Sequence, residues 1–343
     1  MRDATAPSLP ASAPPRVARP RPSLRINPRH LPLAVTIGLF VAMFGAGSLL
    51  FDGFFSLQVF LNLFIDNAFL AITAIGMTFV IIAGGIDLSV GSVIALTTMV
   101  SAALVEQRGW SPAVVIPLVL FLGAAFGFTM GVIIQFFEIQ AFIVTLAGMF
   151  LARGLCYLIS INSITIRNPF YTQVSALRIP FLFETSVSFN VVIALAVLAV
   201  AIYLAHYTRF GRTVYAIGGS EQSALLMGLS VPRTKVLVYT FSGLCSALAG
   251  VVFTFYMLSG YGLHAGGMEM DAISATVIGG TLLTGGFGSV VGTMFGVLIY
   301  GTIQTIIMFQ GTLSSWWTKI VMGLLLLVFC LLQKAFERRS ARR

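Results

Sequence analysis

One short stretch places a carboxylate and two hydroxyl groups among glycines, between long apolar runs. It reads Gly84-Gly85-Ile86-Asp87-Leu88-Ser89-Val90-Gly91-Ser92. A lipid bilayer offers no water to main-chain groups that leave a helix, so such a break is stable only at a membrane edge, inside protein or beside a wet cavity. Asp87 followed by Ser89 is typical of a helix start, with the aspartate oxygen accepting from free N–H groups of the next helix. Two interpretations follow: a capped turn between two membrane spans, or a broken helix on a substrate path.

Several other polar side chains lie in or beside apolar runs. Ionisable groups in such places are costly, which favours a functional role. Asn67 and Gln304 can hydrogen-bond either sugar hydroxyls or neighbouring helices, and Arg153 can either line a path or extend its charge toward the membrane surface. The candidate substrate-path residues are Asn67, Asp87, Ser89, Thr145, Arg153 and Gln304.

Catalytic and metal-binding patterns are weak in this sequence. The glycines of residues 280–287 have the spacing of a phosphate loop, but the stretch lacks the Lys and Ser/Thr that reach phosphate and Mg²⁺. The cysteines, Cys156, Cys245 and Cys330, lie far apart within apolar runs, so we expect neither a disulfide framework nor a zinc site. No histidine pairs with a plausible nucleophile. We therefore expect no enzyme active site and no bound metal.

The composition indicates an integral membrane protein. Of the 343 residues, 58% are hydrophobic and 9% are charged, whereas soluble domains carry about 25% charged residues. A span needs about 20 apolar residues, and this length predicts an all-α, polytopic membrane helix bundle of about ten helices, with broken or short helices near the glycine-rich motifs. The expected spans are 31–51, 66–84, 87–105, 113–135, 140–160, 189–206, 236–258, 271–286, 288–308 and 317–333, of which the eighth is short and interrupted by glycine.

Charge sets the expected topology. Residues 1–30 are rich in Pro and Arg and predict a disordered basic tail, residues 31–333 form the membrane domain, and 334–343 form a second basic tail. With the N-terminus in the cytoplasm, most of the 20 lysines and arginines fall on the cytoplasmic side, in the two tails and in the loop 207–235. Both termini are then cytoplasmic, and the positive charge indicates membrane topology rather than nucleic-acid binding.

Glycines recur every four residues in two of the expected spans. This spacing forms a smooth stripe that lets another helix backbone approach closely. It favours helix packing within the subunit, with a dimer interface as the alternative. The stripes are Gly123, Gly127 and Gly131, and Gly288, Gly292 and Gly296.

The loop 207–235 contains a short helix signal. Ser220 is a good N-cap, Glu221 suits the positive first turn and Gly228 is a good stop. The helix between them has about two turns and ends in Leu225, Leu226 and Met227. A helix this short is marginal alone in water. Its apolar side chains therefore either pack on the protein's own inner face or dock into a cytoplasmic partner.

Taken together, these motifs resemble the permease subunits of ribose-type sugar ABC importers. The resemblance covers about residues 31–333. It is carried by Gly76-Met77-Thr78-Phe79-Val80, the Gly84–Ser92 stretch, Thr145-Leu146-Ala147-Gly148-Met149, Ala216-Ile217-Gly218-Gly219, Val277-Ile278-Gly279-Gly280-Thr281 and Gly288 with Gly292-Thr293. Within that family, Asp66-Asn67-Ala68-Phe69-Leu70 and residues 311–319 are most similar to the galactofuranose importer branch.

The resemblance implies a multi-subunit machine in the bacterial inner membrane. Two permeases, identical or different, would form the pore among membrane lipid, and a periplasmic sugar-binding protein would deliver a monosaccharide. A cytoplasmic ATPase would use ATP and Mg²⁺, with no cofactor bound by this chain and no nucleic acid involved. The implied ATPase-coupling residues are Gly218, Gly219, Ser220, Glu221, Ala224, Leu225, Met227 and Gly228. The alternative is an ion-coupled secondary sugar carrier, for which Asp87 is the best ion-binding candidate.

Overall fold

The structure is a computed structural model that describes residues 31–180, 185–314 and 316–340. The 1–30 tail lies outside the described residues. The helices are α1 (Leu31–Leu50), α2 (Leu57–Asp66), α3 (Ala68–Ile82), α4 (Val90–Ala102), the π-helix η1 (Ala103–Gln107), α5 (Pro112–Phe136), α6 (Ala141–Ile159), α7 (Pro169–Ala176), α8 (Phe189–Tyr207), α9 (Arg209–Gly219), α10 (Glu221–Leu226), α11 (Val231–Met257), α12 (Met268–Ile278), α13 (Val290–Gln310) and α14 (Trp316–Ser340).

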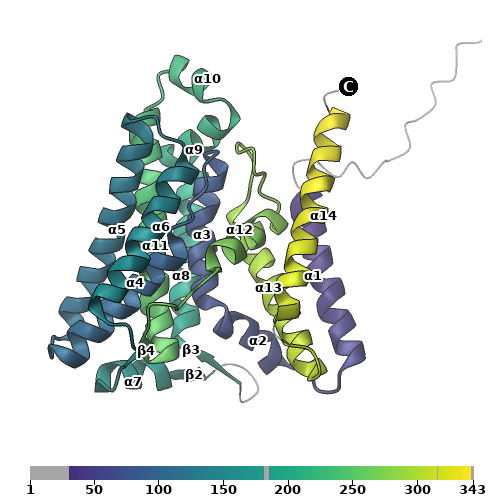
Figure 1. Ribbon diagram of the computed structural model, residues 1–343. Helices are drawn as coiled ribbons and strands as arrows, with labels where there is room; N and C mark the ends of the chain where they lie inside the picture. The colour runs from purple at the N-terminus through teal and green to yellow at the C-terminus, as the bar shows by residue number, and fades with distance from the viewer. Residues whose placement is uncertain (1–30, 181–184, 315, 341–343) are drawn as a thin grey trace, which may run out of the picture.

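Two small sheets complete the described fold. Strand β1 (Ile164–Thr165) pairs antiparallel with β4 (Ser259–Gly260), and β2 (Arg178–Pro180) pairs antiparallel with β3 (Ser186–Ser188). Strands β2 and β3 lie with α7 at one end of the bundle, and α10 projects from the other (Figure 1). We call these the α7 end and the α10 end. The C-terminal part of the last helix, α14, lies at the α10 end.

The predicted polytopic helix bundle is confirmed. Within the described residues, seven helices are long and apolar enough to cross a membrane, and the bent pair α2–α3 makes an eighth candidate span. The two members of that pair meet at 57°, and Asn67 lies at the bend. The apolar part of α14, Trp316–Leu332, is shorter than the seven.

The prediction of a membrane span at 271–286 is wrong. Helix α12 has 11 residues and ends at Ile278, so it is about 16 Å long, whereas a bilayer core is about 30 Å thick. Gly279 and Gly280 leave the helix, and Gly280, Gly285 and Gly286 adopt positive φ values of 93°, 84° and 75°. The apolar composition of this stretch reflects burial within the protein: Ala272, Ala275, Val277 and Ile278 are all buried.

Helix α11 is the centre of the larger group of helices. It packs against α5, α3 and α4, and most of its length is buried. A second group, in which α13 packs against α1, α12 and α14, stands beside the first in Figure 1. Helix α12 also packs against α3, so it joins the two groups.

Candidate functional site: a glycine junction, a projecting helix and an open cavity

Three glycine-rich segments that are far apart in the sequence meet at the α10 end. The N–H of Gly286 donates to the carbonyl of Ile82, 2.9 Å away. A Cβ atom on Gly285 would lie 3.0 Å from the Cα of Gly84 and 3.1 Å from the Cα of Gly218. Main chain therefore packs directly on main chain, which only glycine allows. The end of α3, the end of α9 and the loop between α12 and α13 form this contact, which we call the glycine junction.

Helix α10 begins directly after α9. The Oγ of Ser220 accepts from the N–H of Ser223 at 3.3 Å, as a capping residue does. Glu221 forms an ion pair with Lys235 at 2.6 Å, which ties α10 to the start of α11. Gly228 adopts a φ of 73° after the helix, in the left-handed region that favours glycine. Helix α10, its N-cap and its C-terminal glycine therefore lie where the sequence predicts them.

The last side chains of α10 are unusually exposed for apolar residues. Leu225, Leu226 and Met227 are 50%, 90% and 67% exposed. Ala224, in contrast, is buried against Ile217 and Val231. One side of α10 is therefore held on the protein, and its tip presents an apolar surface beyond the α10 end of the bundle.

In the break between α3 and α4, residues 87–89 are buried whereas Gly84 is exposed, and both oxygens of the Asp87 carboxylate are hydrogen-bonded to serines. Asp87 Oδ1 accepts from the N–H and the Oγ of Ser89 at 3.0 and 2.6 Å, and Oδ2 accepts from Ser242 Oγ at 2.7 Å. Helix α4 begins at Val90 with Ser89 as its N-cap. The predicted bond from Asp87 to a free N–H group at the start of the next helix is thus present, and its donor is Ser89 at the N-cap of α4. Asp87 connects this break to α11.

The remaining path candidates lie in three separate places. Thr145 is buried, with its hydroxyl 2.8 Å from the carbonyl of Ala141 and 3.4 Å from that of Ile86 beside the break. Arg153 donates to the carbonyls of Gly262 and His264 at 2.5 and 2.9 Å, in the segment between β4 and α12. The structure thus brings Asp87, Ser89 and Thr145 together but places Arg153 elsewhere.

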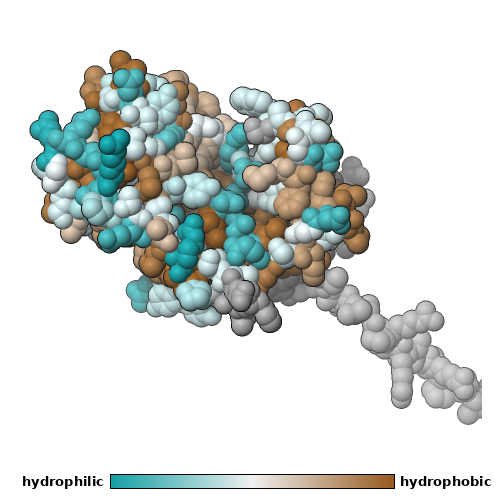
Figure 2. Space-filling model, turned by 90° about the horizontal axis from the view of Figure 1, so that it is seen from below, coloured by the Kyte–Doolittle hydropathy of each residue, from teal (hydrophilic) through white to brown (hydrophobic). Residues whose placement is uncertain are grey.

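Asn67 and Gln304 share a cavity at the α7 end. The cavity has a volume of about 860 Å³ and is formed by α2, α3, α11, α13 and α14. Figure 2 shows this face of the molecule, with hydrophilic side chains beside a hollow between two lobes. The cavity also has polar and aromatic lining residues that the sequence interpretation did not assign to a path, namely Asp66, Tyr256, Tyr300, Trp316 and Lys319. Except for Tyr300, which lies within the predicted span 288–308, their common signal is a polar or aromatic group near the end of an apolar run, which also marks ordinary membrane interfaces.

The glycine stripes lie on helix contacts. A Cβ on Gly123 would lie 2.6 Å from the carbonyl oxygen of Gly243, and one on Gly131 would lie 2.9 Å from the Cα of Val236, so α5 and α11 approach closely. Gly127 lies between them and also faces α11. In the second stripe, Gly292 and Gly296 face the backbone of α12, and Gly288 precedes α13 and faces Thr281.

Comparison with known proteins assigns the chain to a family. Residues 59–330 match the family described as the branched-chain amino acid transport system / permease component. The chain belongs to this family. The resemblance to ribose-type sugar ABC permeases is also confirmed by its relatives.

Three relatives illustrate the similarity. The inner membrane ABC transporter permease protein YjfF of Escherichia coli K12 is 52% identical over 89% of this chain and 92% of its own. The fructose import permease protein FruG of Bifidobacterium longum is 40% identical over 93% and 95%. The ribose import permease protein RbsC of E. coli K12 is 37% identical over 82% and 87%. No solved structure matches significantly.

Proposed function

We propose that this chain is the pore-forming permease subunit of an ATP-driven monosaccharide importer of the bacterial inner membrane, with galactofuranose as the favoured substrate. Both termini and α10 face the cytoplasm. A separate ATPase hydrolyses ATP, a second permease completes the pore and a periplasmic binding protein delivers the sugar. The observation that carries this proposal is the capped helix α10, whose apolar tip projects from the bundle, with Leu226 90% exposed.

Helix α10 is connected to the rest of the bundle in a way that suits coupling. Its first residue is paired with Lys235 on α11, and α9, which precedes it, ends at the glycine junction with α3. Helix α11 in turn holds Asp87 through Ser242. A push on α10 by an ATPase would therefore reach the break between α3 and α4 by two routes, one through α9 and one through α11.

The test is a charge placed on the α10 tip. Leu226→Asp puts a carboxylate where an apolar contact is proposed, and we expect most of the ATP-driven sugar uptake into vesicles to be lost while the chain stays folded, because the side chain makes little contact with its own subunit. Gln222→Asp is the matched control, because it adds the same charge to another exposed position of the same helix. Equal uptake by the two variants would contradict docking through the tip.

A secondary carrier is the second candidate, and the buried carboxylate of Asp87 is the observation that favours it. An ion-coupled carrier would bind a proton or sodium ion at such a group. Its uptake would stop with an uncoupler and survive ATP depletion, whereas the proposed importer has the opposite dependence. Asp87→Asn separates the two candidates further. In the proposed importer Asp87 only holds the break, so the loss of its charge should cause a moderate loss of stability, whereas a carrier would lose its ion-binding group.

A further inference from the structure

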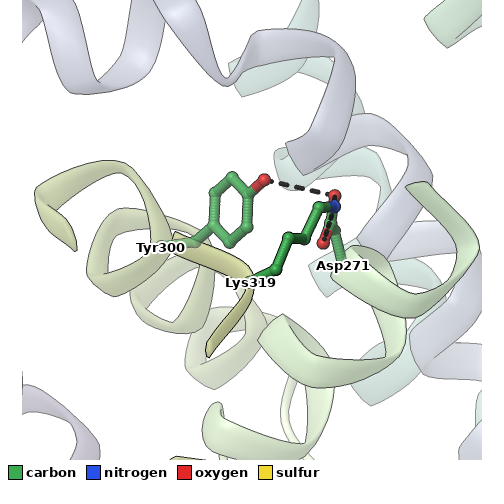
Figure 3. A network of polar contacts seen from close by, with 3 residues as sticks. All are labelled: Asp271, Tyr300 and Lys319. Carbon is green, nitrogen blue, oxygen red and sulfur yellow. Dashed lines mark hydrogen bonds and ion pairs between the residues drawn. The ribbon is translucent and has the colours of Figure 1, made fainter. Parts of the chain in front are cut away.

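The cavity at the α7 end contains a pair of charges that neutralise each other. Lys319 Nζ lies 2.7 and 2.6 Å from the two carboxylate oxygens of Asp271, and the hydroxyl of Tyr300 donates to Oδ2 of the same carboxylate at 3.1 Å. Figure 3 shows the three side chains converging from α12, α13 and α14. Lys319 and Tyr300 line the cavity. Asp271 is 9% exposed and holds both of them in place.

The ion pair leaves hydrogen-bonding capacity directed at the cavity. An ammonium group has three donors, and Asp271 takes two bonds from that of Lys319. Gln304, one turn after Tyr300 on α13, adds an amide that both donates and accepts. These groups serve a ligand that offers many hydroxyl groups, each of which donates and accepts one or more hydrogen bonds.

A second carboxylate is not neutralised. Asp66 lines the cavity from the end of α2 and is exposed. It accepts a hydrogen bond from the hydroxyl of Tyr256 at 3.2 Å, and within the described residues it forms no ion pair. With Lys319 cancelled by Asp271, the cavity carries a net charge of one negative unit.

Apolar surfaces complete the lining. Trp316 and Phe309 present ring systems to the cavity, which can pack against the C–H faces of a sugar ring. A small-ligand pocket usually has a volume of about 300–1,000 Å³ and a few convergent polar groups, and this one has a volume of about 860 Å³.

We propose that this cavity is a monosaccharide-binding site that admits neutral sugars and rejects anionic ones, and that Asp66 sets this charge selection. The proposal rests on the proposed function, because it takes a sugar as the cargo. Tyr300, Gln304 and Lys319 hydrogen-bond the hydroxyl groups, and Asp271 is a positioning residue that also cancels the charge of Lys319. A carboxylate or phosphate on the sugar meets the unpaired charge of Asp66 and binds less tightly.

The size of the discrimination follows from the charge. Two unit charges about 5 Å apart in a half-open cavity repel enough to weaken binding about fivefold to twentyfold, between the limits of bulk water and a less polar surface. Removing the charge of Asp66 should remove most of that factor for an acidic sugar and leave a neutral sugar nearly unaffected.

The experiment measures protection of a cysteine in the cavity. The full chain carries Met308→Cys, at an exposed residue of the cavity lining to which no hydrogen bond with the sugar is assigned. The background is Cys330→Ala, because Cys156 and Cys245 are buried, and the chain is labelled in nanodiscs with a membrane-impermeant maleimide. The probes are D-galactose, D-ribose and D-fructose, with D-galacturonate as the anion that matches galactose. We expect at least one neutral sugar to slow the labelling, and galacturonate to need about five to twenty times the concentration of galactose for equal protection.

Charge variants decide the cause. In Asp66→Asn, the concentration of galacturonate needed for protection should fall to within about twofold of that of galactose, since the substitution removes most of the repulsion. Asp52→Asn, an exposed carboxylate in the loop between α1 and α2 and outside the cavity lining, should change nothing. Asp271→Asn leaves the charge of Lys319 without its partner and should also lower the concentration of galacturonate needed for protection. Lost packing alone would not produce this effect.

Three results would overturn the proposal: equal protection by galactose and galacturonate in the reporter chain with Asp66 intact, an unchanged ratio in Asp66→Asn, or protection by none of the neutral sugars. The assay uses neither ATP nor an ATPase. Selective protection in a chain whose uptake ignores ATP would therefore contradict the proposed function alone, and ATP-driven uptake without protection would contradict this site alone.

Discussion

Gly218→Ala tests the glycine junction, and the neighbouring residue provides its control. A Cβ on Gly218 would press on the carbonyl oxygen of Ile82 and on the main chain of Gly286, whose Cα would be 3.0 Å away. A Cβ on Gly219, the next residue of the same helix, would meet nothing within 4 Å. The two substitutions add the same methyl group to α9, and only one of them must push three segments apart.

The magnitude follows from packing. Overfilling a packed contact costs about 1–3 kcal/mol, and Ala in place of Gly returns at most about 1 kcal/mol of helix propensity. Gly219→Ala should therefore be neutral or slightly stabilising, whereas Gly218→Ala should destabilise the chain. If a net cost of about 1–2 kcal/mol falls on only one of the two conformations between which the permease alternates, the balance between them shifts by about fivefold to thirtyfold.

Two assays on the same preparations are sufficient: thermal unfolding in detergent and ATP-driven sugar uptake in proteoliposomes. We expect Gly218→Ala to lower the unfolding temperature and to reduce uptake, with Gly219→Ala close to the unmodified chain in both. Identical behaviour of the two variants would refute the idea that this backbone contact matters.

Two further predictions concern the hydrogen bond between Ser242 and Asp87 and the pKa of a buried tyrosine. Ser242→Ala removes the only described partner of Asp87 Oδ2. It should lower the free energy of unfolding by about 1–3 kcal/mol, because a buried carboxylate oxygen is left unpaired. Chemical denaturation in detergent measures this change, and an unchanged free energy of unfolding would contradict the prediction. Burial raises the pKa of Tyr215, so the folded state favours the neutral form of this side chain. The stability that the neutral form contributes is fully present below about pH 10, the pKa of an unfolded tyrosine, and should be lost as the pH rises through the raised pKa. The fall in unfolding temperature above that pH should be smaller in Tyr215→Phe, and an equal fall would be evidence against this assignment.

Local signals in the sequence were sufficient for the α10 helix. Ser220, Glu221 and Gly228 act on their near neighbours, so their pattern predicts the start and the stop without knowledge of the rest of the fold. The break at Gly84–Ser92 is predictable for the same reason, because glycines and an aspartate interrupt an apolar run.

Tertiary contacts explain what the sequence did not predict. The stretch 271–286 is apolar because α12 is enclosed by α3, α13 and α14, and hydropathy does not distinguish burial in protein from burial in lipid. The pairing of Asp271 with Lys319 joins residues 48 positions apart, so neither side chain alone indicates a site. The meeting of Gly84, Gly218 and Gly285 likewise depends on the fold as a whole.

The most direct test of the central claim is sugar uptake by proteoliposomes assembled from purified parts. The chain is reconstituted with its second permease, with and without the ATPase, and uptake is measured with ATP, without ATP and with an uncoupler. We expect uptake only when both the ATPase and ATP are present, and no loss of uptake with the uncoupler. Uptake by the membrane chains alone, or uptake that stops with the uncoupler while ATP remains, would contradict it.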